Sequence, residues 1–181
     1  IAEGDITGDA RPDLVISDAN ANTVTVLVNN GTGTLASIGG PYPTGSSPYG
    51  LALGFVDGDG SRDIVVANEA SNTVGVFIND SAGTFGVQRA FPVGAHPVAV
   101  ALADLNLDGI TDLAVANQSD GTVGVLAGAG DGTFGAQTAY ATGAGATALA
   151  LGDFDGDGLR DIAVANNGTI TATVLFARCA P

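Results

Sequence analysis

Four aspartate-rich segments of nine residues recur along the chain at nearly constant spacing, and this periodicity restricts the folds that it can adopt. Their ninth residues are Asp13, Asp63, Asp112 and Asp161, at intervals of 50, 49 and 49 residues. Repeats of this length are typical of proteins in which similar supersecondary units stack on one another. We therefore expect one domain of four repeats, approximately residues 1–48, 49–97, 98–146 and 147–181.

The nine-residue frames have the composition of calcium-binding loops. The frame at residues 153–161 carries carboxylates at positions 1, 3, 5 and 9 and a glycine at position 6, which allows a sharp backbone turn. Ca²⁺ takes about six to eight oxygen ligands, and alternate residues of a tight loop can direct their carboxylates at one centre. We call residues 5–13, 55–63, 104–112 and 153–161 loops one to four.

Short apolar segments with a period of two residues surround each loop and predict β-strands. Residues 49–54 precede loop two, residues 64–67 follow it, and a third and a fourth segment complete the repeat. Large Leu, Ile or Val residues alternate with Ala or Gly, so both faces of each strand are apolar and must be covered. Four short antiparallel strands per repeat, arranged radially, satisfy this demand, and we predict an all-β fold, a β-propeller of four blades.

The two ends of the chain are incomplete by the standard of the inner repeats. The first predicted strand is short, and the fourth repeat lacks a fourth strand after Phe176. Three arrangements accommodate these ends: a segment of a longer propeller, a small four-bladed ring, or several chains joined through their open sheet edges. Cys179, the single cysteine, is either an inert thiol or a bridge to a further part of a secreted chain.

The loop motif, the strand after it that ends in Ala165 and Asn166, and the turn Gly-Asp-Gly-Thr-Phe-Gly at residues 130–135 resemble the FG-GAP/VCBS repeats. Those repeats build propellers of the integrin-α type, and the resemblance covers essentially the whole chain. It implies an extracellular calcium-bearing propeller, usually of about seven blades, as found in adhesion proteins, lectins and large secreted or surface proteins.

The resemblance also implies a ligand set for up to four structural Ca²⁺ ions. The implied ligands are Asp153, Asp155, Asp157 and Asp161 in loop four, Asp104, Asn106, Asp108 and Asp112 in loop three, Asp57, Asp59 and Asp63 in loop two, and Asp5, Asp9 and Asp13 in loop one. Loop two has Phe55 at position 1, and loop one has Thr7 at position 3 and Ala10 at position 6. We expect these two loops to bind calcium more weakly.

Other calcium-binding families do not fit the residues that follow the loops. An EF-hand requires glutamate at position 12 and flanking helices. Position 12 is Ile16, Val66, Val115 or Val164, within a strand pattern. Dockerin-like helices fail on the same residues, and a nonapeptide β-helix needs a much shorter period than 49 residues.

Catalytic chemistry has little support in this sequence. The chain contains one His and one Cys, and its aspartates are mostly assigned to the loops, so we predict that it is not an enzyme. A net charge of −14 argues against nucleic-acid binding, and no apolar run of about 18 residues could span a membrane. Turns before the innermost strands gather near a propeller axis, so Ser47, Tyr49 and His96 are candidate ligand contacts.

These observations predict a non-enzymatic, extracellular or cell-surface calcium-binding propeller that acts in adhesion or in binding of a glycan or an extracellular protein. Two alternatives remain open. The chain could be a structural subunit of a surface layer or filament that self-associates through its open sheet edges. It could also be the non-catalytic part of a secreted enzyme that acts on a polysaccharide or a phosphoester.

Overall fold

The computed structural model describes residues 1–178, and this part of the chain consists of four antiparallel sheets without a helix. Each sheet is one repeat, which we call blades one to four. Blade one contains β1 (Ala2–Gly4), β2 (Asp13–Asp18), β3 (Thr23–Asn29), β4 (Leu35–Ser37) and β5 (Tyr42–Pro43). Blade two contains β6 (Pro48–Gly54), β7 (Asp63–Asn68), β8 (Thr73–Phe77) and β9 (Arg89–Pro92).

The remaining blades repeat this order. Blade three contains β10 (Pro97–Ala103), β11 (Asp112–Asn117), β12 (Thr122–Leu126) and β13 (Thr138–Ala141), and blade four contains β14 (Ala146–Gly152), β15 (Asp161–Asn166) and β16 (Thr171–Leu175). The prediction of four strands per repeat is confirmed in blades two and three. In blade one the outer strand is divided into β4 and β5, which both pair with β3. Within residues 1–178, β16 is the last strand of blade four, as predicted.

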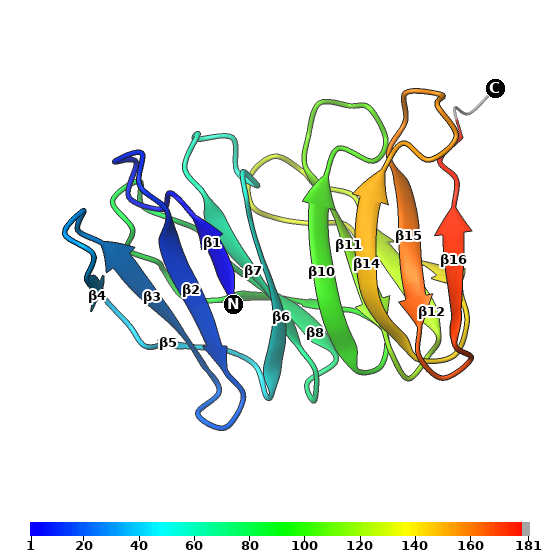
Figure 1. Cartoon of the computed structure of the whole chain (residues 1–181), viewed down its shortest axis with the longest axis horizontal. Helices are drawn as coiled ribbons and strands as arrows, with labels where there is room; N and C mark the ends of the chain where they lie inside the picture. The colour runs from blue at the N-terminus through cyan, green and yellow to red at the C-terminus, as the bar shows by residue number, and fades with distance from the viewer. Residues whose placement is uncertain (179–181) are drawn as a thin grey trace.

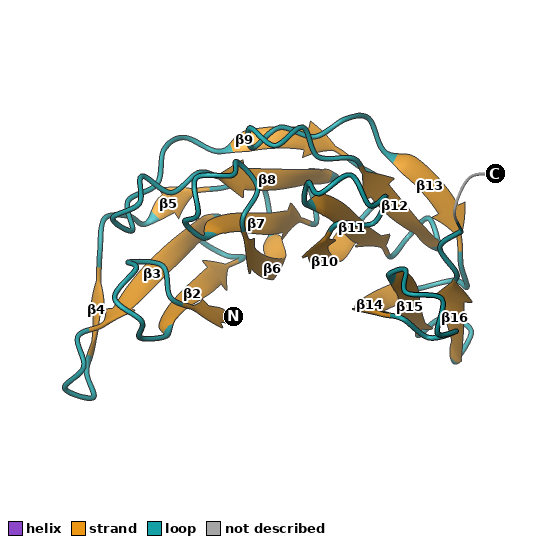
Figure 2. Cartoon of the chain, turned by 90° about the horizontal axis from the view of Figure 1, so that it is seen from above, coloured by secondary structure: helices purple, strands orange, loops and turns teal. Residues whose placement is uncertain are grey.

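The four blades stack into an open arc. Figure 2 shows β6, β10 and β14 along its concave side, with β9 and β13 along the convex side. Innermost strands of successive blades pack beside one another, β6 against β10 and β10 against β14. The predicted propeller-type stacking is confirmed, but the arc does not close, so a closed four-bladed ring is not what these residues form.

The hydrophobic core lies between the blades. Because successive side chains of a strand point to opposite faces, Ile64 and Val66 of β7 pack against blade one, whereas Val65 packs against blade three. Phe85 and Phe134, from the turns before the outer strands, are also buried between blades. Burial of one such side chain contributes about 1.5–3 kcal/mol.

The upper and lower sides of the arc, as drawn in Figure 1, carry different loops. The aspartate loops follow the innermost strands and lie at the upper end in Figure 1, whereas the turns that lead into these strands lie at the opposite end. The described residues contain no helix that is long and apolar enough to cross a membrane.

Candidate metal centre

The ninth residues of the four loops are buried aspartates. Each accepts one backbone hydrogen bond from its own loop and one from the end of the third strand or the residues just after it. In loop four, Asp161 Oδ2 accepts a bond from the N–H of Phe154 at 2.8 Å, and Oδ1 accepts one from Ala177 at 2.9 Å. The equivalent carboxylates of Asp13, Asp63 and Asp112 make the same pair of bonds at 2.9–3.0 Å. Each of these side chains therefore joins its loop to the third strand or the residues just after it.

The remaining loop aspartates shape the backbone. Asp153 at position 1 accepts bonds from the N–H groups of Gly156 and Gly158, at 2.7 and 3.0 Å. The position-5 carboxylate accepts the N–H of position 7 in every loop, at 2.7–2.9 Å. Gly158 at position 6 has a φ of 86°, a conformation that suits glycine. Loop one holds Ala10 there at 64°, which is uncommon for a residue with a Cβ.

Carboxylates converge most closely in loop four. The oxygens of Asp153, Asp155 and Asp161 lie within 4.8 Å of one another, and no other such group of three forms between residues 1 and 178. Asp157 does not belong to this group, and its Oδ1 accepts the N–H of Leu159. Like charges at this separation repel one another, so the cluster suits a hard cation with oxygen ligands.

Loop three offers a second indication of a cation. Asp104 at position 1 accepts one bond, from Gly109 N–H at 2.9 Å to its Oδ2. Its Oδ1 is buried and has no hydrogen-bond partner. A buried carboxylate oxygen without a donor is costly, and a metal ion would satisfy it. The residues of loops three and four thus fit calcium, which is the ion that the sequence predicts.

Loops one and two carry arginines near their aspartates. In loop one, Arg11 forms an ion pair with Asp9 and donates through Nε to the carbonyl of Asn29 at 2.9 Å. In loop two, the Arg62 guanidinium lies 5.0 Å from the ring centroid of Phe55, which occupies position 1. A protein cation thus partly takes the place of a metal in loop one, and loop two lacks one carboxylate. The weaker calcium binding expected of both loops stays a prediction.

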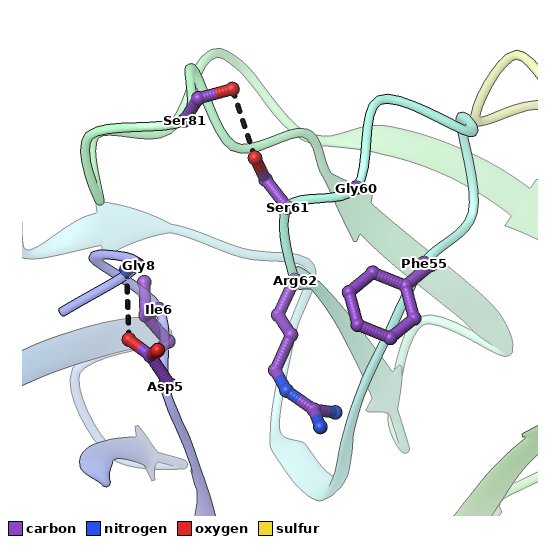
Figure 3. Close-up of a pocket in the computed structure, with 8 residues that line it drawn as sticks. All are labelled: Asp5, Ile6, Gly8, Phe55, Gly60, Ser61, Arg62 and Ser81. Atoms are coloured by element: carbon purple, nitrogen blue, oxygen red, sulfur yellow. Dashed lines mark hydrogen bonds between the residues drawn. The ribbon is translucent and has the colours of Figure 1, made fainter. Parts of the chain in front are cut away.

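A pocket of about 260 Å³ separates these two loops (Figure 3). Asp5 lies on one side of it, and Arg62 beside Phe55 on the other. Ser61 donates a hydrogen bond to the Ser81 hydroxyl at 2.9 Å across the upper rim. Ser81 in turn donates to Asp59 Oδ2, and hydrogen bonds, chiefly from the Ser61 N–H, lower the pKa of Asp59. Burial, by contrast, raises the pKa of Asp63 to about 6.

The three candidate ligand contacts lie at the end opposite the loops. Ser47 donates its N–H to Asn22 Oδ1 at 2.7 Å, and His96 donates its N–H to Asn72 Oδ1 at 2.9 Å. Both bonds tie the hairpin of one blade to the turn that enters the next blade. Tyr49 follows on the innermost strand and is 60% exposed. The ligand-binding role of these residues stays a prediction.

Sequence reasoning missed Asn22 and Asn72 as links between blades. Both have positive φ angles, 55° and 54°, in the turn between the second and third strands. Their spacing of 50 residues matches that of the loops and is the signal that could have identified them. Gly121 has the corresponding φ of 60° in blade three but offers no side chain to make this bond.

Comparison with known proteins supports this architecture. A sequence model described as FG-GAP-like repeat matches residues 56–115 and residues 104–164. No curated protein sequence matches the chain.

Similar solved structures have low sequence identity and support the fold alone. BBS1N, solved in complex with ARL6DN, is 16% identical with a TM-score of 0.64, over 99% of this chain and 57% of that chain. A lectin of Agrocybe aegerita that recognises non-reducing terminal N-acetylglucosamine is 21% identical with a TM-score of 0.58, over 97% and 51%. Virginiamycin B lyase from Staphylococcus aureus is 18% identical with a TM-score of 0.56, over 98% and 55%. The chain therefore spans little more than half the length of these three proteins.

Proposed function

Because the chain belongs to the FG-GAP-like repeat family, we propose that it is a non-catalytic extracellular binding module whose blades are stabilised by Ca²⁺. The observation that carries this proposal is the convergence of Asp153, Asp155 and Asp161 in loop four. The unpartnered Oδ1 of Asp104 in loop three is consistent with it.

Calcium in this proposal has a structural role. Asp153, Asp155 and Asp161 would hold the ion in loop four, and its positive charge would offset the repulsion between their carboxylates. Asp161 also bonds to Ala177 beyond the third strand. Ion binding in loop four should therefore also stabilise, through Asp161, the position of the residues that follow β16. An ion that binds only the folded chain stabilises it by mass action, by about 2.7 kcal/mol at a concentration 100 times the Kd.

Calcium titration followed by calorimetry and thermal melting tests this role. Addition of Ca²⁺ to ion-free protein should raise the melting temperature, and Asp155→Asn should reduce both the heat of binding and the rise. Asp18→Asn is the matched control, because Asp18 also caps a turn through Oδ1 but lies outside the loops. An identical melt with and without calcium would refute the structural role.

The binding face in this proposal is the side of the arc opposite the aspartate loops, which contains Tyr49 and His96. An exposed tyrosine ring can stack on a sugar, and both a glycan and an extracellular protein are chemically suitable partners. Screening of immobilised glycans and surface proteins should give saturable binding that Tyr49→Ala weakens while the melting temperature is retained. Val87→Ala removes another exposed apolar side chain and should leave binding unchanged.

A further inference from the structure

Aromatic pairs recur at the interfaces between blades. Phe85, in the turn before the outer strand of blade two, packs edge-on against Tyr42 of blade one, with ring centroids 5.5 Å apart. Phe134 of blade three packs in the same way against Phe91 of blade two, at 5.7 Å. Strand register makes Tyr42 and Phe91 equivalent, because they lie opposite Val24 and Val74. Each of these two interfaces thus combines an outer-strand ring with a ring from the next blade.

The third interface contains only half of this pair. Tyr140 lies opposite Val123 and is the equivalent of Tyr42 and Phe91. Its partner would come from the outer turn of blade four, and residues 1–178 do not supply one. Tyr140 is 46% exposed, whereas Tyr42 is 8% exposed. A groove of about 670 Å³ lies there, lined by Tyr140 and Val125 of blade three and by Ile162 and Leu175 of blade four.

The same groove has an unpaired strand edge as one wall. In blades two and three, the third strands β8 and β12 each pair with an outer strand. In the described chain, β16 pairs with β15 alone, so its other edge presents free backbone donors and acceptors. Such an edge readily accepts an added strand. The groove and the edge are therefore adjacent parts of one incomplete blade.

We propose that this groove binds an extended peptide segment, from outside residues 1–178, that carries an aromatic residue in a Gly-x-aromatic-Gly turn followed by a β-strand. The strand pairs with β16, and the aromatic ring packs on Tyr140 as Phe85 packs on Tyr42. In that pair the Phe85 N–H also donates to the Tyr42 hydroxyl, at 3.3 Å, and Tyr140 offers the same acceptor. A second folded copy does not fit, because its own Phe85 and Phe134 are buried between its blades.

Thr173 determines which strand sequence can dock. In blade three, Gln137 of the outer segment lies over Gly124, where a Cβ would be 2.1 Å from Gln137 Oε1. Gly75 has the same relation to Gln88 in blade two. The equivalent residue of β16 is Thr173, since it lies opposite Val164 as Gly124 lies opposite Val115. A glutamine in the docked strand would therefore clash with the threonine side chain.

Two further observations support this preference. Thr173 Oγ1 accepts a bond from Asn166 Nδ2 at 2.9 Å, as Gln137 Oε1 does from Asn117 Nδ2 at 3.3 Å, so the threonine replaces the glutamine as the acceptor. Blade one shows the matching combination. In blade one, Thr25 occupies the position that Gly124 has in blade three. Gly39, three residues before Tyr42, occupies the position of Gln137. The docked segment should therefore carry a small residue there.

Peptide binding tests the proposal without changing the protein core. The probe copies residues 131–141, Asp-Gly-Thr-Phe-Gly-Ala-Gln-Thr-Ala-Tyr-Ala, with the glutamine replaced by alanine and a fluorophore at its N-terminus. Fluorescence anisotropy with the whole chain should show saturable binding. The unaltered glutamine peptide should bind about tenfold more weakly because of overpacking against Thr173. A peptide in which alanine replaces the phenylalanine should lose most of its binding.

Protein variants complete the design. Thr173→Gly should remove the discrimination between the alanine and glutamine peptides, and Tyr140→Ala should weaken both while its exposed position leaves the melt unchanged. Hydrogen exchange should show new protection along β16 when the peptide is bound. Equal binding of the probe and of the peptide in which alanine replaces the phenylalanine would overturn the proposal. So would a lack of binding by the folded monomer. Self-association that buries β16, seen by sedimentation, would overturn it in favour of a second copy.

Discussion

Replacement of Phe134 by alanine measures how strongly the outer turns hold the blades together. Phe134 is 8% exposed, and its ring packs edge-on against Phe91 at 5.7 Å. Removal of a buried phenylalanine side chain costs about 3–5 kcal/mol. The aromatic contact accounts for about 0.5–1.5 kcal/mol beyond area burial. We expect a loss of about 3 kcal/mol, near the lower limit, because a turn at the edge of the sheet can relax into the space.

Equilibrium urea denaturation at fixed calcium concentration, followed by circular dichroism, measures this loss. Total stabilities of domains are about 5–15 kcal/mol, so the change should be a large fraction of the whole. Val87→Ala is the control, because Val87 is 93% exposed and should change stability by less than about 0.5 kcal/mol. If Phe134→Ala costs less than about 1 kcal/mol, the aromatic pair does not hold the interface. The basis for the proposed peptide contact with Tyr140 is then removed as well.

Two further predictions concern a buried carboxylate and an exposed hydrogen bond between blades. Burial raises the pKa of Asp63 to about 6 from 3.8, so the folded, calcium-free chain binds this proton more tightly than the unfolded chain. The resulting stabilisation is complete below pH 3.8 and is lost as pH rises through about 6. The urea midpoint of the calcium-free protein should fall over this pH range, and Asp63→Asn should reduce the fall. Asn72→Ala removes the acceptor of the His96 N–H and should destabilise the junction of blades two and three by about 1 kcal/mol. An unchanged urea midpoint would show that water replaces this bond.

Local sequence determined the blades. The period of the loops located each repeat, and the alternation of large and small apolar residues predicted strands covered on both faces, because these patterns depend on near neighbours in the chain. The short first strand and the missing outer strand after β16 were also predictable, by comparison of the repeats. The convergence of Asp153, Asp155 and Asp161 in loop four was predictable for the same reason, whereas Asp157 lies outside this group. The ligand set of loop three stays a prediction.

Tertiary structure alone decided which side chains meet between repeats. Asp161 was predicted as a loop residue, but its bond to Ala177 depends on how the third strand pairs with the second. The exposure of Tyr140 depends on a turn that the next blade would have to provide. The repeat specifies each sheet through local pairing, whereas contacts between blades depend on the stacking of complete sheets. The open arc and the groove beside Tyr140 are therefore visible only in three dimensions.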